Sequence, residues 1–349
     1  MALVQHHPSL KPETAPVCSV CIANYNGVHM LGDCLDSALA QTPNIPVEII
    51  VHDDASTDDS VAFLRERYPQ VEILASADNV GFCIGNNRMV AHARGEYVLL
   101  LNNDAALFPD ALASLLDAAR DQAHAGILTL PQYDWRSGDL VDRGYLLDPF
   151  YNPVPNLDAN RSDVAYVIGA CMFLPRALWN ELGGFPEWLG SLAEDMYLCC
   201  LARLRGLPVQ VTQGSGYRHR QGASFGGNRA DATGLHTTYR RRALSERNKT
   251  AVMVICTPTR LVWLWLALHC AVLAIEGALL TLLKRDARMW GKIYWHAIGY
   301  VLHHLGELRA RRRDVQRSRQ VGLGVYWRGF TWQPRKLDLL RRHGLPDLH

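Results

Sequence analysis

The feature that most constrains the fold of this 349-residue chain is an alternation of strand-like and helix-like segments near its beginning. Short apolar runs predict four buried strands, at residues 17–23, 47–51, 71–74 and 97–101. Helical spacing of apolar residues predicts helices between them, at residues 29–40, at 61–68 and from the turn at 79–81 to about residue 93. This alternation is typical of βαβ units, so we expect an α/β fold with a Rossmann-like, mostly parallel sheet flanked by helices.

Polar turns follow three of the predicted strands, at residues 24–26, 52–54 and 102–104. Parallel strands bring such turns to one edge of the sheet, where open α/β sheets bind their ligands. Asp104, preceded by two asparagines, suits a hard divalent cation that shares phosphate oxygens with a ligand. The alternative for this stretch alone is a polar turn in which Asp104 caps the next helix.

The remaining segments of the first 250 residues are less regular. We expect a loose tail at 1–16, loops over the sheet at 133–163, and a further apolar strand at 165–174. Ser191 and Glu194 have the spacing of a capping box, which predicts a helix over about 192–205. The glycine-rich stretch at 214–234 predicts a mobile loop.

The composition changes near residue 250, so we expect a flexible tail at 1–16, one domain over 17–250 and a helical, basic, membrane-associating region over 251–349. Nine scattered cysteines complete no zinc-binding pattern, which favours reduced thiols in a cytosolic protein. The first 16 residues lack the pattern of a secretory signal.

The stretch 261–283 is apolar apart from Glu276, and a second stretch at 289–305 mixes apolar and aromatic residues. They predict a helical hairpin that lies in or dips into one leaflet of a membrane. Four tryptophans are expected at interface depth: Trp263, Trp265, Trp290 and Trp295. The arginines that follow would meet anionic lipid on the cytoplasmic face. A full membrane span, a buried helical pair and a homodimer interface are the alternatives.

Five sequence pieces together resemble family 2 glycosyltransferases with the GT-A fold. They lie at residues 17–27, 52–58, 79–82, 100–104 and 194–195, and the resemblance covers about residues 17–225. The stretch 81–87 and the Asn-Asn-Asp sequence at 102–104 look most like the branch that includes bacterial rhamnosyltransferases.

The resemblance implies a set of residues that bind the nucleotide sugar. Asp53 should accept a hydrogen bond from the N–H of the base, and Ala23 and Tyr25 should line the base pocket, although a plain core role for Tyr25 competes. Asn79 and Asn87 should hold the ribose or the diphosphate. Asn103 is expected to bind the nucleotide sugar as well.

The resemblance also implies the residues that carry the chemistry. Asp104 corresponds to the last acid of the family's Asp-x-Asp motif and should bind Mg²⁺ or Mn²⁺, while Asn102 stands at the first acid. His219 matches a metal- or phosphate-contacting histidine, against the alternative of a solvated side chain. Asp195 should act as general base, against the alternative that it only complements a helix dipole.

The sequence thus predicts an inverting, metal-dependent glycosyltransferase at the cytoplasmic face of the cell membrane. It would move a sugar such as L-rhamnose from its dTDP donor to a lipid-linked or polysaccharide acceptor, with no nucleic-acid partner. The alternative, supported by Asn102, is a catalytically silent membrane scaffold protein that binds a nucleotide sugar. A sugar nucleotidyltransferase ranks lower because no glycine-rich phosphate loop lies near the first strand.

Overall fold

The computed structural model describes residues 3–121, 126–220, 222, 229–231, 234–345 and 347–348. The chain forms two compact units, which we call the sheet unit and the helical unit. The sheet unit comprises Met1–Tyr145, Pro155–Ala202 and Leu207–Arg220, and the helical unit comprises Leu146–Val154, Arg203–Gly206 and Gln221–His349. The domain limits expected from composition, 17–250 and 251–349, stay a prediction.

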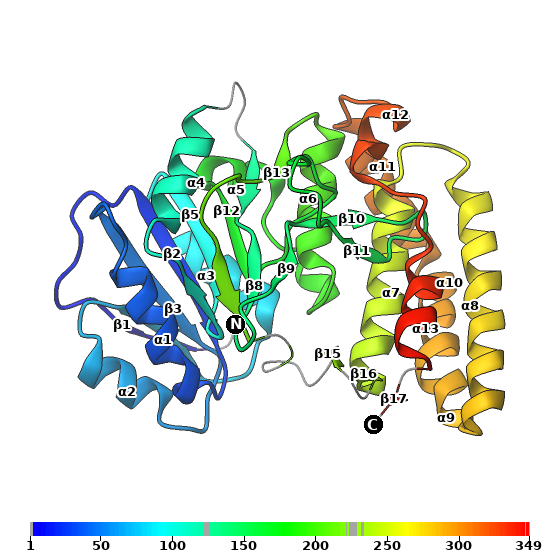
Figure 1. Ribbon diagram of the computed structural model, residues 1–349, viewed down its shortest axis with the longest axis horizontal. Helices are drawn as coiled ribbons and strands as arrows, with labels where there is room; N and C mark the ends of the chain where they lie inside the picture. Colours follow the sequence, from blue (N-terminus) through cyan, green and yellow to red (C-terminus); the bar gives the residue numbers. More distant parts are fainter. Residues whose placement is uncertain are drawn as a thin grey trace. The chain divides into compact units, whose positions relative to one another are not determined.

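An eight-stranded sheet organises the sheet unit, with the strand order β1-β4-β3-β2-β5-β12-β7-β13 (Figure 1). The four neighbours β4, β3, β2 and β5 are parallel, which confirms the expected βαβ core. β12 runs antiparallel to β5 and β7, and β13 runs parallel to β7. The strands are β1 Val4–His7, β2 Cys18–Asn24, β3 Val47–Asp53, β4 Glu72–Ser76, β5 Tyr97–Asn102, β7 Ile127–Thr129, β12 Cys171–Pro175 and β13 Val209–Val211.

The expectation of a loose tail at 1–16 is wrong for β1, which pairs antiparallel with the exposed edge of β4. An edge strand presents unpaired backbone groups, and the segment 4–7 covers them. Its side chains are largely exposed, so no apolar pattern marks it as a strand in the sequence.

Helices cover both faces of the sheet, which explains why its central strands are apolar runs rather than alternating ones. Val20 and Val51 share a buried cluster with Leu35 of α1, and α2 and α4 contribute to the same cluster. Gly85 of α3 lies against His52, the neighbour of Val51, so α3 covers the opposite face. These helices are α1 Val28–Leu39, α2 Ser60–Arg67, α3 Phe82–His92 and α4 Ala111–Arg120.

A second, four-stranded sheet has the order β6-β14-β8-β9, with strands β6 Ala105–Leu107, β8 Gln132–Asp134, β9 Leu140–Asp142 and β14 Tyr217–His219. The segment 133–163 is therefore not loop alone, because it also holds β10 Tyr145–Leu147 and β11 Pro153–Pro155. Likewise, the whole of β14 lies within the expected mobile loop at 214–234. Residues 221, 223–228 and 232–233 of that stretch lie outside the described residues.

The expected capping box at 191–194 is wrong. Leu192 and Ala193 have φ values of 71° and 68°, in the left-handed region, so they cannot form the first turn of a helix. The helix α6, Glu194–Leu204, begins after them. This start places Glu194 and Asp195 at the N-terminus of α6. The sheet unit also contains α5 Arg176–Leu182 and a short 3₁₀ turn at Glu187–Leu189.

In the helical unit, α8 packs back against the segment 290–295, as expected for a helical hairpin. Leu273 and Leu280 of α8 share a buried cluster with Ile293 and Tyr294. The elements are α7 Tyr239–Cys256, α8 Val262–Lys284, α9 Ala287–Met289, a π-helix at Trp290–Trp295, α10 His296–His303, α11 Leu305–Arg317, α12 Leu323–Tyr326, a 3₁₀ turn at Trp327–Gly329, α13 Arg335–His343, and the strands β15 Arg229–Asp231, β16 Gly234–Thr237 and β17 Asp347–Leu348.

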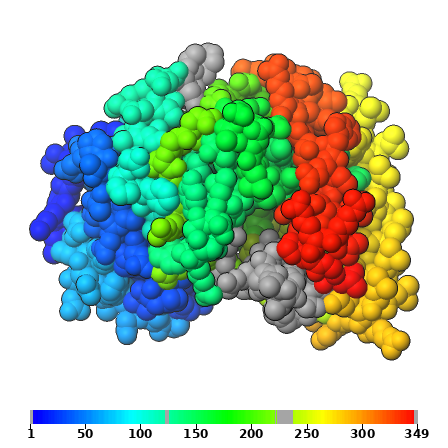
Figure 2. Space-filling model, in the orientation of Figure 1, coloured from blue at the N-terminus to red at the C-terminus, as the bar shows by residue number. Residues whose placement is uncertain are grey.

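Among the described residues, α8 is the one helix that is long and apolar enough to cross a membrane, judged by length and composition. Only 28% of the most apolar 18-residue stretch of α8 is buried within the protein. The yellow atoms of α8 lie at the surface in Figure 2. The carboxylate of Glu276 pairs with Arg242 at 2.7 Å and with Lys336 at 2.5 Å, so this carboxylate is paired inside the helical unit. The indole N–H of Trp265 donates to the carbonyl oxygen of Pro149 at 2.8 Å, which places this tryptophan in internal packing.

Candidate functional site

A chain of buried hydrogen bonds joins the ends of β3, β2 and β5. The Nδ2 of Asn24 donates to the Oδ2 of Asp53 at 2.9 Å, and the Nδ2 of Asn103 donates to the Oδ1 of Asn24 at 2.7 Å. All three side chains are nearly inaccessible to solvent. The structure therefore brings Asp53 and Asn103 together. Sequence reasoning missed Asn24 as the bridge, although its place at a strand end was a signal.

The carboxylate of Asp53 is held in one orientation by Ser56, whose backbone N–H and hydroxyl donate to it at 3.0 and 2.7 Å. Ala23 lies half-buried between its strand neighbours His52 and Asn102. The side chain of Tyr25 is 53% exposed just beyond the strand end, so the alternative of a core tyrosine is wrong. The roles of Asp53, Ala23 and Tyr25 toward a base stay predictions.

Asp54 fixes the loop that carries Asn79, and this residue was also missed from the sequence. Its Oδ1 accepts from the N–H of Val80 at 2.7 Å, and its Oδ2 accepts from the N–H of Gly81 at 2.9 Å. The Nδ2 of Asn79 donates to the carbonyl oxygen of Asp54 at 3.2 Å. The exposed Asn79 side chain is thereby tied to the end of β3, next to Asp53.

Asn87 lies on α3 and uses both ends of its amide to hold the turn at Phe185. Its Nδ2 donates to the carbonyl oxygen of Phe185 at 2.9 Å, and its Oδ1 accepts from the N–H of Phe185 at 3.0 Å. These bonds give Asn87 a positioning role in the fold, and its contact with a ribose or diphosphate stays a prediction.

Asp104 and His219 meet although they are 115 residues apart. The Oδ1 of Asp104 lies 3.1 Å from the Nε2 of His219, and the two side chains are 2% and 10% exposed. The antiparallel pairing of β14 with β6 causes the meeting, because it sets His219 opposite Ala105. The alternative of a solvated His219 is therefore wrong.

The surroundings of His219 fit a divalent cation at Nε2. The Oε1 of Gln132 lies 3.0 Å from the Nδ1 of His219 and accepts from the hydroxyl of Tyr217 at 2.8 Å. With the ring proton on Nδ1 donating to Gln132, the Nε2 lone pair would be left for a cation beside the carboxylate of Asp104. Such an outer hydrogen bond typically orients a metal-binding histidine.

No group of three or more His, Cys, Asp or Glu side chains gathers as a metal site among the residues that the structure describes. Asp104 and His219 would thus supply two ligands, and phosphate oxygens and water the others, as is usual for Mg²⁺. All nine cysteines are free thiols, eight of them buried, and none joins this pair.

Asp195 is linked to the same edge of the sheet through Gly169. The Oδ2 of Asp195 accepts from the N–H of Gly169 at 3.2 Å, and its Oδ1 accepts from the N–H of Met196 at 2.7 Å. The next residue, Ala170, accepts from the N–H of Asn102 at the end of β5 at 3.1 Å. Asp195 and Asp104 therefore both lie beside the end of β5. Asp195 also stands in the first turn of α6, where its charge complements the N-terminus of that helix.

Comparisons with solved structures identify the fold. A mannosyltransferase from Pyrobaculum calidifontis, solved with GDP-Man and Mn²⁺, superposes with a TM-score of 0.52 at 18% identity over 86% of this chain and 90% of its own. GalNAc-T7, solved with UDP, GalNAc and Mn²⁺, gives a TM-score of 0.62 at 13% identity over 96% of this chain and 59% of its own. The chain has the GT-A fold of such transferases.

Residues 19–183 match the sequence model of Glycosyl transferase family 2. A chondroitin synthase from Escherichia coli is 34% identical over 188 residues, which are 52% of this chain and 26% of the relative. An N-acetylglucosaminyl-diphospho-decaprenol L-rhamnosyltransferase from Mycobacterium tuberculosis is 26% identical over 192 residues, or 46% of this chain and 62% of the relative. The chain thus spans less than two thirds of the length of these relatives.

Proposed function

We propose that this chain is an inverting glycosyltransferase that takes a sugar from a nucleotide donor at the edge formed by β3, β2 and β5. The observation that carries the proposal is the meeting of Asp104 with His219 beside the hydrogen-bonded chain of Asp53, Asn24 and Asn103. The nucleotide would lie along the strand ends, with its base near Asp53 and its diphosphate near Asp104. This is the place where open α/β sheets bind nucleotides.

A divalent cation held by Asp104 and His219 would offset the negative charge of the departing diphosphate. Asp195 takes the proton of the acceptor hydroxyl as its oxygen bonds to the anomeric carbon. The bond between that carbon and the donor phosphate oxygen breaks, and the nucleoside diphosphate leaves with the electron pair. The N–H groups of Gly169 and Met196 keep the carboxylate of Asp195 in one orientation during this transfer.

For the donor and acceptor, we propose L-rhamnose from dTDP-rhamnose and a lipid-linked or polysaccharide acceptor, handled at the cytoplasmic face of the cell membrane. The mycobacterial relative, whose name gives a lipid-diphosphate acceptor and rhamnose, supports this choice. The exposed apolar face of α8 supports the membrane location. Mg²⁺ and Mn²⁺ both suit the donor set of Asp104 and His219.

The test compares wild-type protein with the Asp195→Asn and Asp104→Ala variants. We would first find which of dTDP-rhamnose, UDP-sugars and GDP-mannose raises the melting temperature in the presence of Mn²⁺, since a ligand stabilises the state it binds. Release of nucleoside diphosphate from that donor should fall by about a hundredfold or more in Asp195→Asn, the usual loss for a general base. Asp104→Ala should also lose the effect of Mn²⁺ on the melting temperature.

The matched control is Asp117→Asn, because Asp117 is a solvent-exposed carboxylate on α4. It should keep wild-type release. Full release in both site variants would refute the mechanism. A wild-type protein that binds the donor but releases nothing would instead be the catalytically silent alternative.

A further inference from the structure

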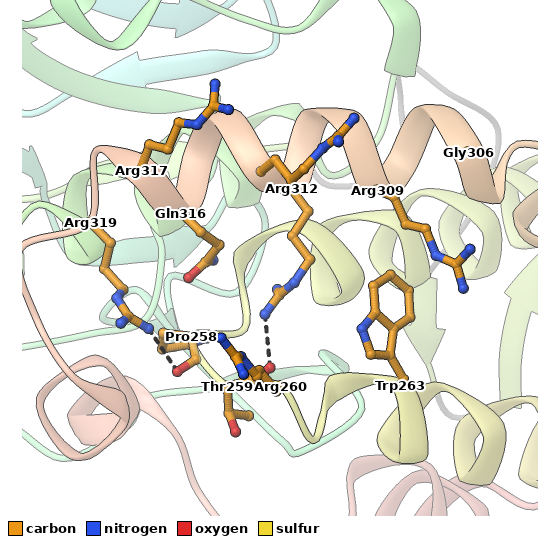
Figure 3. Close-up of a pocket in the computed structure, with 11 residues that line it drawn as sticks. Pro258, Thr259, Arg260, Trp263, Gly306, Arg309, Arg312, Gln316, Arg317 and Arg319 are labelled. Atoms are coloured by element: carbon orange, nitrogen blue, oxygen red, sulfur yellow. Dashed lines mark hydrogen bonds between the residues drawn. The ribbon is translucent and has the colours of Figure 1, made fainter.

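A basic pocket of about 1020 Å³ lies in the helical unit, between the α7–α8 connection and α11 (Figure 3). No carboxylate is among the eleven residues that line it. Six of them are arginines, and the full lining is Pro258, Thr259, Arg260, Trp263, Gly306, Arg309, Arg312, Arg313, Gln316, Arg317 and Arg319. Helical periodicity explains the gathering, because positions 309, 312, 313 and 316 share one face of α11.

Two arginines of the lining are committed to the fold. The guanidinium of Arg312 donates to the carbonyl oxygens of Val254 and Thr257 at 2.7 Å each, and thereby caps the C-terminus of α7. Arg319 donates to the carbonyl oxygen of Pro258 at 2.9 Å. Burial lowers the pKa of Arg312, but an arginine stays charged at neutral pH. These two guanidinium groups are therefore held in place by backbone carbonyls.

Among the other four arginines, Arg317 pairs with Asp314 at 3.2 Å, which leaves Arg260, Arg309 and Arg313 for a ligand. Arg260 and Arg313 are exposed and form no ion pair with a carboxylate in the part of the chain that the structure describes. Arg309 stacks over the ring of Trp263, with its guanidinium carbon 5.0 Å from the ring centroid. Arginines crowded without counter-charge repel each other, and an anion that binds several of them relieves this repulsion.

The apolar surface beside the pocket indicates what kind of molecule carries the anion. Leu261 and Leu264 are 65% and 71% exposed, and they flank Trp263 at the start of α8. At 100° per residue, the large exposed apolar residues of α8 and its N-cap residue Leu261 fall on one face of the helix. They are Leu261, Leu264, Leu268, Ile275, Leu279, Leu282 and Leu283. A soluble phosphate would leave this face uncovered, whereas a lipid covers it.

We propose that the pocket binds the headgroup of a membrane lipid that ends in a phosphate monoester or a diphosphate. A phosphodiester offers two free oxygens and one negative charge, too few for the three arginines of the pocket that neither cap the backbone nor pair with a carboxylate. A terminal phosphate offers three oxygens and up to two charges, which several guanidinium groups bind together. The inference rests on the proposed membrane association but not on the proposed catalysis.

The experiment measures binding of the full chain to phosphatidylcholine vesicles that contain either phosphatidic acid, a phosphate monoester, or phosphatidylglycerol, a phosphodiester, at equal surface charge. We expect preference for phosphatidic acid. The double variant Arg260→Gln with Arg313→Gln should lose about tenfold or more in affinity for phosphatidic acid. The control removes two exposed arginines elsewhere, Arg120→Gln with Arg341→Gln, and should keep the preference.

Equal binding of the two lipids, or equal losses in the pocket and control variants, would mean diffuse charge attraction and would overturn the inference. Inorganic pyrophosphate serves as a soluble competitor and as a soluble test ligand. Competition by pyrophosphate for phosphatidic acid vesicles supports a phosphate site. A rise in melting temperature with pyrophosphate but no lipid preference would assign the pocket to a soluble phosphate and overturn the lipid source. Nucleoside diphosphate release by wild-type protein is measured separately, so failure of this inference leaves the proposed function standing.

Discussion

Gly27 follows β2 and leaves the space in which Asn103 and Asn24 form their hydrogen bond. A Cβ atom at Gly27 would lie 2.1 Å from the Nδ2 of Asn103 and 2.5 Å from the Oδ1 of Asn24. Neither neighbour can retreat freely, because both are buried and Asn24 also donates to Asp53. At the scale of single residues, the hydrogen bond between Asn103 and Asn24 requires that residue 27 has no side chain.

The Gly27→Ala substitution should therefore destabilise the protein by about 1–3 kcal/mol, the usual cost of overpacking. It should also weaken the rise in melting temperature caused by whichever of UDP, GDP and dTDP stabilises wild-type protein most. The measurement is urea unfolding together with thermal shift.

The matched control for Gly27→Ala is the same substitution at Gly299, in the middle of α10, where a Cβ atom meets nothing within 4 Å. Alanine there should stabilise the helix by about 0.5–1 kcal/mol. A Gly27→Ala variant that behaves like Gly299→Ala would disprove the packing explanation.

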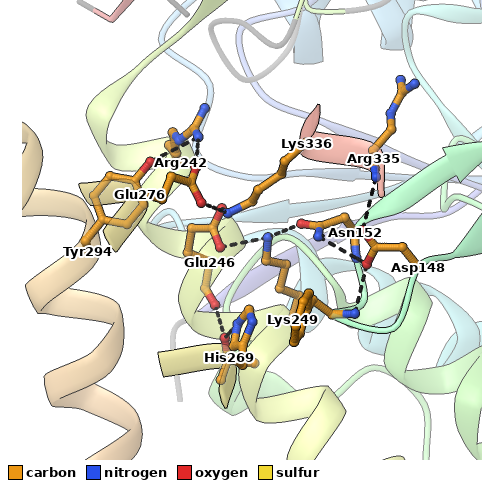
Figure 4. Close-up of polar contacts among 12 residues, drawn as sticks. Asp148, Asn152, Arg242, Glu246, Lys249, His269, Glu276, Tyr294, Arg335 and Lys336 are labelled. Carbon is orange, nitrogen blue, oxygen red and sulfur yellow. Dashed lines mark hydrogen bonds and ion pairs between the residues drawn. The ribbon is translucent and has the colours of Figure 1, made fainter. Parts of the chain in front are cut away.

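At the scale of elements, α7 is fixed by a buried charge network rather than by apolar packing alone (Figure 4). The carboxylate of Glu246 pairs with Lys249 at 2.7 Å and with Lys336 of α13 at 2.8 Å. Burial lowers the pKa of Lys249 to about 8. Burial alone would raise the pKa of Glu246, but Lys249, Lys336 and Arg242 together hold it well below its ordinary value.

The lowered pKa of Glu246 predicts a pH dependence of stability. The unfolded chain binds a proton at Glu246 near pH 4.5, while the folded protein does not until a much lower pH. The contribution of this carboxylate to stability is thus complete above pH 4.5 and falls by about 1.4 kcal/mol for each pH unit below it. Unfolding free energies measured at pH 7, 4 and 3 would show this loss.

The Glu246→Gln variant separates the contribution of Glu246 to the pH dependence of stability from the contributions of other carboxylates. It should be less stable at pH 7 by about 3 kcal/mol, since the buried Lys249 loses its carboxylate partner and Lys336 loses one of its two. Below pH 4.5 its stability should fall less steeply than that of wild-type protein. Parallel pH curves would show that Glu246 is not the group responsible.

At the scale of the whole molecule, the chain combines a sheet unit of GT-A fold with a helical unit that exposes a continuous apolar face on α8. Monomeric soluble proteins seldom expose large apolar patches, and such patches mark contact with a partner or a membrane. Glu276 and Trp265 turn their polar atoms into the helical unit, which leaves the outer face of α8 to leucines and isoleucine.

Membrane association can be tested on this face through Leu264 and Leu279, which are 71% and 53% exposed. Replacing both with serine should weaken binding to anionic vesicles about a hundredfold, from about 1.5 kcal/mol for each leucine withdrawn from lipid. The unfolding free energy should change by less than about 0.5 kcal/mol per site.

Leu157→Ser with Leu337→Ser is the control, because these leucines are 59% and 52% exposed but lie outside α8. This control variant should bind vesicles as wild-type protein does. If both pairs of substitutions leave sedimentation with vesicles unchanged, α8 does not contact the membrane.

The sequence by itself determined the βαβ core, because apolar periodicity and the turns after each strand are local properties of the chain. Parallel pairing then made the convergence of Asp53 and Asn103 predictable. Only the tertiary structure decided the rest. The contact of Asp104 with His219 depends on the pairing of β14 with β6, and the bridging role of Asn24 depends on neighbours 29 and 79 residues away. The arginine pocket likewise exists because α11 lies against the end of α7, a long-range packing that no local pattern encodes.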